Sequence, residues 1–130
     1  GFAKALQMAT DNYEQDSAYI KGLKLYMMER LKKNSKGVAF NGDPLGRSLY
    51  EVLSASFPKT EKSEMILFNL DINNICASGG SACTSGADQG SHVIRAINNN
   101  PNQVTVRFSF SKHNTKEEID AVVEKLKELI

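Results

Sequence analysis

Two cysteines in a stretch rich in glycine and serine offer the clearest reactive chemistry in this sequence. Cys76 and Cys83 lie in residues 76–86, which read Cys-Ala-Ser-Gly-Gly-Ser-Ala-Cys-Thr-Ser-Gly. No large side chain anchors the segment between them, and its glycines leave many backbone conformations open. We therefore predict a mobile loop over about residues 76–90 that begins at a strand end and carries Cys83 near its middle. An exposed, mobile thiol can act as a nucleophile through its thiolate, provided that a cation or cofactor elsewhere activates it.

Other functions of the same residue types have to be weighed against a nucleophile. The cysteines and histidines of the chain are Cys76, Cys83, His92 and His113, and their spacing matches no structural zinc pattern. Redox dithiols usually have two residues between the thiols, whereas six separate these two. We predict no metal site. From the residues alone, Cys83 fits an incidental surface thiol as well as it fits a nucleophile.

The other three of these side chains have simple structural interpretations. Cys76 lies at the predicted strand end and is expected to be a small buried hydrophobic residue. His92 follows Ser91, a predicted helix cap, and is expected to have a structural role. His113 precedes the last predicted helix and is expected to be solvated.

Composition narrows the function classes. The chain has 130 residues, of which 41% are hydrophobic and 24% charged, as in an ordinary globular domain. Its formal net charge of +1 gives no electrostatic reason to expect nucleic acid or a membrane surface as a partner. No apolar run approaches the roughly 20 residues of a membrane span. Two cysteines are too few for a disulfide-stapled secreted scaffold, so we predict a cytoplasmic location.

Hydrophobic periodicity predicts a mixed fold. A long helical stripe predicts a helix over residues 2–33, and no capping residue precedes it, which indicates a domain cut from a larger protein. The other predicted elements are strands at 38–40, 51–57, 74–77 and 104–110, helices at 61–70 and around 93–97, and a last helix that begins after Thr115. This order predicts an α+β fold, in which helices pack on one face of a small, mainly antiparallel sheet.

Three segments carry more detailed predictions. Apolar and polar residues alternate from 104 to 110, which predicts a half-buried strand with Arg107 on its polar face. Thr115 and Glu118 form a capping-box pair at the start of the last helix. Helix 61–70 is expected to begin at Thr60 and to bury a broad apolar face, formed by Met65, Ile66, Leu67, Phe68 and Leu70.

Three motifs follow one another over about the last 55 residues. They read Ser-Gly-Gly-Ser-Ala-Cys-Thr-Ser-Gly at 78–86, Ser-His-Val-Ile-Arg-Ala at 91–96, and Val-Arg-Phe-Ser-Phe at 106–110 with Thr-Lys-Glu-Glu-Ile-Asp at 115–120. Together they resemble the cysteine desulfurases, the NifS/IscS-like branch of the class V aminotransferases. A weaker similarity reaches back to residues 1–6, which resemble the helix after the cofactor domain of that family, and to residues 40–43.

The resemblance implies a reaction and the roles of two residues. In this family, pyridoxal phosphate on a lysine of a large domain forms an adduct with L-cysteine, and a loop cysteine attacks the sulfur of the substrate. Alanine is released, and a persulfide remains on the enzyme. Cys83 matches that nucleophile, and Arg107 matches the arginine that grips the substrate carboxylate. From periodicity alone, Arg107 would more often be a surface ion-pair partner.

The chain also departs from the family. Residues 47–51 read Arg-Ser-Leu-Tyr-Glu, where the family more often has a stretch like proline-glycine-asparagine. Nothing resembles the cofactor lysine of the family, its aspartate for the pyridine nitrogen, or its stacking aromatic ring. We therefore predict no cofactor-binding residue in this chain, and we expect pyridoxal 5'-phosphate to be bound by a large domain that the chain lacks.

The resulting hypothesis is that residues 1–130 are the C-terminal small domain of a cysteine desulfurase, a sulfurtransferase, and are inactive in isolation. The whole enzyme is expected to be a cytoplasmic homodimer that passes sulfur to an acceptor or scaffold protein, for iron–sulfur cluster assembly or thiolated cofactors. The alternatives are a related class V enzyme such as a selenocysteine lyase, a noncatalytic sulfur-carrier or partner-docking module, and a metal-binding module.

Overall fold

The fold is a three-stranded antiparallel sheet covered by helices. The computed structural model describes residues 1–79, 92–97 and 100–130, apart from the side chains of Glu64 and His92. The strands pair in the order β1-β2-β3. In chain order the elements are α1 (Phe2–Asn34), β1 (Ala39–Phe40), β2 (Val52–Pro58), the 3₁₀ helix η1 (Lys62–Met65), α2 (Ile66–Asp71), α3 (His92–Ile97), β3 (Gln103–Ser109) and α4 (Lys116–Leu129).

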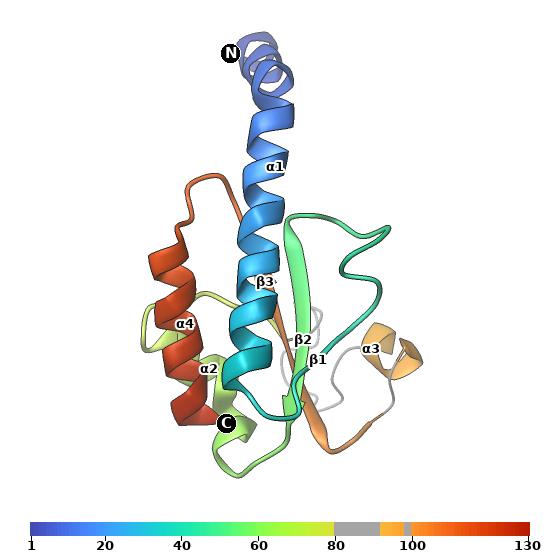
Figure 1. The fold of residues 1–130 in the computed structure, drawn as a ribbon, viewed down its shortest axis with the longest axis vertical. Coiled ribbons are helices and arrows are strands. Elements are labelled where there is room, and N and C mark those ends of the chain that lie inside the picture. Colours follow the sequence, from blue (N-terminus) through green and yellow to red (C-terminus); the bar gives the residue numbers. More distant parts are fainter. Residues whose placement is uncertain (80–91, 98–99) are drawn as a thin grey trace.

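One hydrophobic core joins the helices to the sheet. Helices α1 and α4 lie side by side over one face of the sheet (Figure 1), and buried residues of α2 extend the same core. Every second residue of β2, namely Leu53, Ala55 and Phe57, faces this core. The fully or nearly fully buried members include Leu23, Met27 and Leu31 of α1, Leu53, Ala55 and Phe57 of β2, Val106 of β3, and Val123 and Leu126 of α4. The predicted α+β class with a small antiparallel sheet is confirmed.

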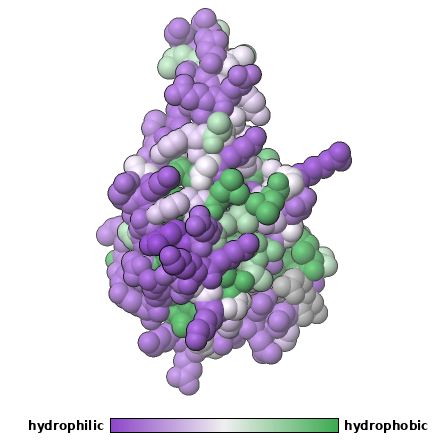
Figure 2. All heavy atoms as spheres, in the orientation of Figure 1, coloured by the Kyte–Doolittle hydropathy of each residue, from purple (hydrophilic) through white to green (hydrophobic). Residues whose placement is uncertain are grey.

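Helix α1 is longer than the body that it packs against. One face of its C-terminal half is buried, from Ser17 to Leu31, whereas its N-terminal end projects away from the sheet (Figure 1). Phe2 is 84% exposed, and Leu6 and Tyr13 are also exposed, so only half of the predicted stripe is covered by described residues. More hydrophobic side chains are visible on the face shown in Figure 2, and the exposed ones of the chain include Leu25, Leu45 and Leu49. None of the described helices is long and apolar enough to cross a membrane.

Polar contacts fix α4 against α1. The Asp120 carboxylate of α4 accepts hydrogen bonds from the Tyr26 hydroxyl at 2.9 and 3.0 Å, and it lies 2.8 Å from Nε of Arg30. The hydrogen bond to Asp120 raises the pKa of Tyr26, because the carboxylate disfavours a phenolate beside it. These contacts hold α4 against α1.

The capping box predicted for the last helix is confirmed. The Glu118 backbone N–H donates to the Thr115 hydroxyl at 3.3 Å, and the Thr115 N–H donates to the Glu118 carboxylate at 3.0 Å. The Asn114 side-chain amide also donates to Glu118, and together these bonds lower the pKa of the Glu118 carboxyl.

The prediction of one helix over residues 61–70 with a broad buried face is wrong. A 3₁₀ turn that begins at Lys62, with Glu61 at its N-cap, precedes α2. The predicted cap, Thr60, lies one residue earlier, and its hydroxyl accepts a hydrogen bond from the Ser63 N–H at 3.2 Å. Ile66 and Leu70 are buried, but Met65 and Phe68 are each 57% exposed. Successive helical residues are about 100° apart, so four consecutive apolar residues cannot all face one core.

The predicted strand at residues 74–77 is also absent. After α2 the chain turns through Asn74, whose φ of 61° is left-handed, and the Asn73 and Ile75 N–H groups both donate to the Leu70 carbonyl. This turn uses the backbone groups that would begin a ladder. In the part of this segment that the structure describes, up to residue 79, the pairing with β3 is an isolated bridge between Ser78 and Arg107.

Candidate functional site

Arg107 lies on the sheet face opposite the core, as its place in the alternating pattern predicted. Its neighbours Val106 and Phe108 are buried under the helices, whereas the Arg107 side chain is exposed. Across the sheet its partner in register is Ser54 of β2. Arg107 thus projects from the middle of a paired strand, which gives its guanidinium a rigid support.

The side chain of Arg107 is held by Ser78, which directly precedes the glycine-rich stretch. The Arg107 Nε donates to the Ser78 hydroxyl at 3.1 Å. The two backbones also exchange hydrogen bonds, with Ser78 N to Arg107 O at 3.1 Å and Arg107 N to Ser78 O at 2.6 Å. The start of the predicted nucleophile loop is therefore attached to the strand that carries Arg107.

Gly79 brings this segment unusually close to the sheet. A Cβ atom added at Gly79 would lie 2.6 Å from Cδ1 of Leu67 and 3.3 Å from the Thr105 carbonyl oxygen. Only glycine fits such an approach without displacing the neighbouring side chain.

Small hydroxyl side chains surround Arg107 on this face. The Asn41 amide donates to the hydroxyls of Ser54 at 3.1 Å and of Ser56 at 2.8 Å. The Ser56 hydroxyl also lies 2.8 Å from that of Thr105. These hydroxyl and amide groups satisfy one another's hydrogen-bonding capacity, and Ser56 is buried.

Arg107 is not neutralised by a carboxylate of the described part of the chain. The ion pairs there join Arg30 to Asp120, Lys112 to Asp16, Lys125 to Glu128, and Lys127 to Glu124. The interpretation of Arg107 as an ordinary surface ion-pair partner therefore finds no support in residues 1–79, 92–97 and 100–130. An exposed guanidinium fixed through Nε is instead suited to bind a carboxylate from outside the chain.

The structure tests the prediction for Cys76 but not the prediction for Cys83. Cys83 lies outside the described residues, together with most of the predicted loop, the Ser91 cap and the side chain of His92, so those predictions stand as they were made. The prediction that Cys76 is buried is wrong, because it is an exposed free thiol. Without a strand at 74–77, no neighbouring strand covers its side chain. His113 is exposed, as predicted.

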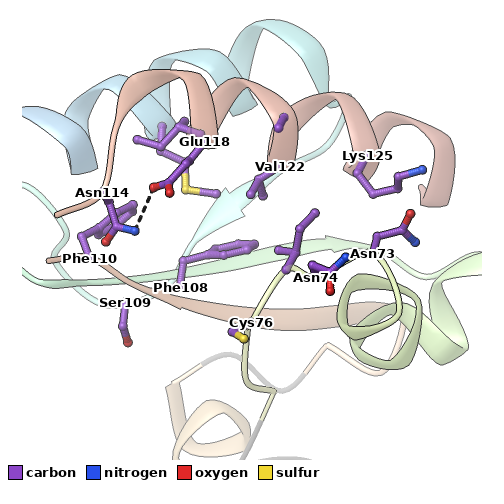
Figure 3. A pocket seen from close by; sticks show the side chains of 14 residues that line it. Asn73, Asn74, Cys76, Phe108, Ser109, Phe110, Asn114, Glu118, Val122 and Lys125 are labelled. Atoms are coloured by element: carbon purple, nitrogen blue, oxygen red, sulfur yellow. Dashed lines mark hydrogen bonds between the residues drawn. The ribbon is translucent and has the colours of Figure 1, made fainter.

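Cys76 borders a pocket of about 540 Å³ between β3, α4 and the segment after α2 (Figure 3). Phe108, Val122 and Ile119 give it apolar walls, and Asn114 and Glu118 lie at its α4 end. Arg107 points from the other face of β3 and does not line this pocket. The pocket and the guanidinium are therefore separate features.

The exposure of Cys76 makes a simple prediction. In a Cys83→Ala variant of the chain, we expect a small disulfide reagent to titrate one thiol under native conditions, because Cys76 needs no unfolding to react. Absorbance of the released thiolate measures this titration, and a variant that also carries Cys76→Ser is the blank. A thiol that reacts only in denaturant would contradict the exposed position.

Lys24 is held inside the fold by polar contacts to the loop between β1 and β2. Lys24 is the one buried lysine among the described residues, and its ammonium group donates to the Ser48 hydroxyl at 3.0 Å and to the Leu49 carbonyl at 2.9 Å. Burial lowers the pKa of Lys24, but its contacts hold the loop between β1 and β2. Among the described residues, no group of three or more metal-ligating side chains could hold an ion.

Sequence reasoning missed Ser78 as a functional candidate. In the sequence, Ser78 is a serine beside two glycines, which is typical of any loop. Its partner Arg107 is 29 positions away, so no local pattern connects the two residues. Only the pairing of this segment with β3 brings the hydroxyl to the guanidinium.

Comparisons with known proteins identify the family of this chain. The sequence model of the aminotransferase class-V family matches residues 1–122. Cysteine desulfurase IscS of Pseudoalteromonas translucida is 31% identical over 132 residues, covering 100% of this chain and 32% of that protein. A mitochondrial cysteine desulfurase of Arabidopsis thaliana is 32% identical over 126 residues, covering 95% of this chain and 27% of that protein.

The fold has a solved counterpart as well. The structure of a NifS-like protein superposes with a TM-score of 0.75 at 26% identity, covering 97% of this chain and 31% of that chain. The chain thus spans about a third of the length of the relatives that it matches. On the family match over residues 1–122, this chain belongs to the aminotransferase class-V family.

Proposed function

We propose that this chain is the C-terminal small domain of a pyridoxal-phosphate-dependent cysteine desulfurase. In this proposal Cys83 takes sulfur from L-cysteine, and Arg107 binds the carboxylate of the substrate. The chain spans about a third of its named cysteine desulfurase relatives, which supports a missing large domain. Since the sequence contains nothing that resembles the cofactor-lysine motif of the family, we expect the 130-residue chain alone not to turn over L-cysteine.

The observation that carries the proposal is the bridge between Arg107 and Ser78. Four residues separate Ser78 from Cys83, so the Cα of Cys83 lies within about 18 Å of that of Ser78, the span of five extended Cα–Cα steps. A thiol on so short a tether can work on a small amino acid whose carboxylate is held by Arg107. The guanidinium is exposed and is fixed through Nε, as such binding requires.

The reaction assigned to Cys83 is a sulfur transfer in which atoms and electrons balance. The Cys83 thiolate attacks the sulfur of L-cysteine, a sulfur–sulfur bond forms, and the carbon–sulfur bond of the substrate breaks. The electron pair of that bond stays on carbon, which takes a proton and becomes the methyl group of alanine. Cys83 is left as a persulfide. Pyridoxal phosphate, bound by the large domain, supplies the electron sink that such a reaction needs.

Exposed apolar residues support a contact with a further domain. Phe2, Leu6 and Tyr13 lie along the projecting half of α1, where a packing partner would remove their apolar surface from water. We propose that the large domain packs there and that the whole enzyme is a homodimer. We also propose that it works in the cytoplasm and passes sulfur to an acceptor or scaffold protein for iron–sulfur cluster assembly.

The test is to find which thiol carries the sulfur. The full-length enzyme that contains this chain is incubated with L-cysteine and pyridoxal phosphate, alkylated and digested with trypsin. Cleavage after Lys62 and Arg95 leaves both cysteines on one peptide, so fragmentation between Cys76 and Cys83 is needed to assign the persulfide. We expect the extra sulfur on Cys83.

Two variants make the assignment independent of fragmentation. Cys76→Ala should keep the mass of one additional sulfur on this peptide, whereas Cys83→Ala should lose it. Release of alanine without a persulfide on either cysteine would replace the proposal by a lyase that needs no loop thiol. No alanine from the full-length protein would leave a noncatalytic sulfur-carrier or docking module.

A further inference from the structure

We infer that Ser78 is a positioning residue, which holds the guanidinium of Arg107 so that its two terminal nitrogens face the substrate carboxylate. The inference rests on the proposed function for the identity of that substrate. Its structural basis is the hydrogen bond from Arg107 Nε to the Ser78 hydroxyl at 3.1 Å. Nothing in the sequence motif alone assigns this task to Ser78.

The guanidinium nitrogen that donates to Ser78 determines which nitrogens of Arg107 remain for a carboxylate. A guanidinium offers donors on Nε and on the two terminal nitrogens, and a bidentate carboxylate uses two neighbouring positions. Because Ser78 already occupies Nε, the pair of terminal nitrogens remains for the ligand. Ser78 thereby selects end-on binding and limits rotation of the group before substrate arrives.

The hydroxyl itself is held in place by its surroundings. Two backbone hydrogen bonds join Ser78 to Arg107, at 3.1 and 2.6 Å, so the donor and acceptor residues are fixed to each other. The next residue, Gly79, packs so closely that a Cβ there would lie 2.6 Å from Leu67. The backbone of Ser78 is therefore fixed relative to Arg107. For this reason a single hydrogen bond from its hydroxyl is enough to orient the long Arg107 side chain.

Ser54, on the strand that pairs with β3, provides a matched control for the substitution of Ser78. It is the residue paired with Arg107 across β2 and β3, and it also carries a hydroxyl. That hydroxyl accepts a hydrogen bond from the Asn41 amide at 3.1 Å rather than from the arginine. Removing it changes the same surface without removing the contact to Nε.

The decisive experiment compares Ser78→Ala, Ser78→Thr and Ser54→Ala in the full-length enzyme. We expect Ser78→Ala to raise KM for L-cysteine about tenfold, with kcat changed less than about threefold, because the substrate carboxylate meets a less ordered guanidinium. Ser78→Thr keeps an acceptor and should restore KM to within about twofold of wild type. Ser54→Ala should behave as wild type. An unchanged KM in Ser78→Ala, or a threonine variant as impaired as the alanine variant, would overturn the inference.

A second readout does not need turnover and separates this inference from the proposed function. In this 130-residue chain labelled with ¹⁵N, the Arg107 Nε–H signal should exchange with water several-fold faster in Ser78→Ala than in wild type or in Ser54→Ala. Equal exchange rates would show that the hydroxyl does not hold the guanidinium. If the wild-type enzyme releases no alanine but Nε–H exchange still depends on Ser78, the cysteine substrate is wrong while the positioning role stands.

Discussion

Replacing Arg107 by alanine in the full-length enzyme is expected to lower kcat/KM for L-cysteine by about 100-fold, or about 2.7 kcal/mol of transition-state stabilisation. The exposed guanidinium has no carboxylate partner among the described residues, so its charge is free to pair with the substrate. Steady-state release of alanine measures the effect.

Arg107→Lys distinguishes charge from geometry. Lysine keeps the positive charge but has neither the fork that binds a carboxylate through two nitrogens nor an Nε–H to donate to Ser78. We therefore expect it to lose nearly as much kcat/KM as alanine. A lysine variant close to wild type would mean that Arg107 supplies only charge.

Arg95→Ala is the matched control for Arg107→Ala. Arg95 is an exposed arginine of α3, outside the sheet, so its loss removes the same charge from the protein without touching the bridge to Ser78. It should keep kcat/KM within about twofold. Since the Arg107 side chain lies outside the core, Arg107→Ala should change the free energy of unfolding by less than about 1 kcal/mol. Activity retained within threefold by Arg107→Ala would remove it from the substrate site.

The sequence was sufficient to predict the structure correctly where a single local pattern determines it. Alternation along residues 104–110 placed Arg107 on the polar face because a strand has only two faces. The Thr115 and Glu118 pair fixed the start of α4 because both partners of the capping box lie within four residues.

The predictions were wrong or incomplete where contacts between residues far apart in the sequence determine burial and pairing. Nothing local distinguishes the buried Ile66 from the exposed Met65 and Phe68, since burial depends on which side of a short helix meets the core. Cys76 was expected to be buried, but it is exposed, because the chain turns at Asn74 and residues 74–77 do not form a strand beside β3. Ser78 could not be identified because its partner is 29 positions away.

The sheet that supports Arg107 depends on the packing of its other face, and Phe57 is the test of that dependence. Phe57 is fully buried in β2, and its strand pairs with β3 from Val52↔Ser109 to Pro58↔Gln103. Phe57→Ala leaves a cavity under the sheet and should lower the free energy of unfolding of this chain by about 3–5 kcal/mol. Urea denaturation followed by far-ultraviolet circular dichroism measures this loss.

Phe68→Ala removes the same side chain from a position that is 57% exposed, so it should cost less than about 1 kcal/mol. Whole domains are stable by only about 5–15 kcal/mol, so Phe57→Ala should place this chain near its unfolding threshold. Equal losses for the two phenylalanines would contradict the core described above. If Phe57→Ala also raises the Arg107 Nε–H exchange rate at temperatures where the chain stays folded, the apolar face of the sheet contributes to the order of the guanidinium on the polar face. No change in that rate would mean that the bridge to Ser78 is sufficient by itself.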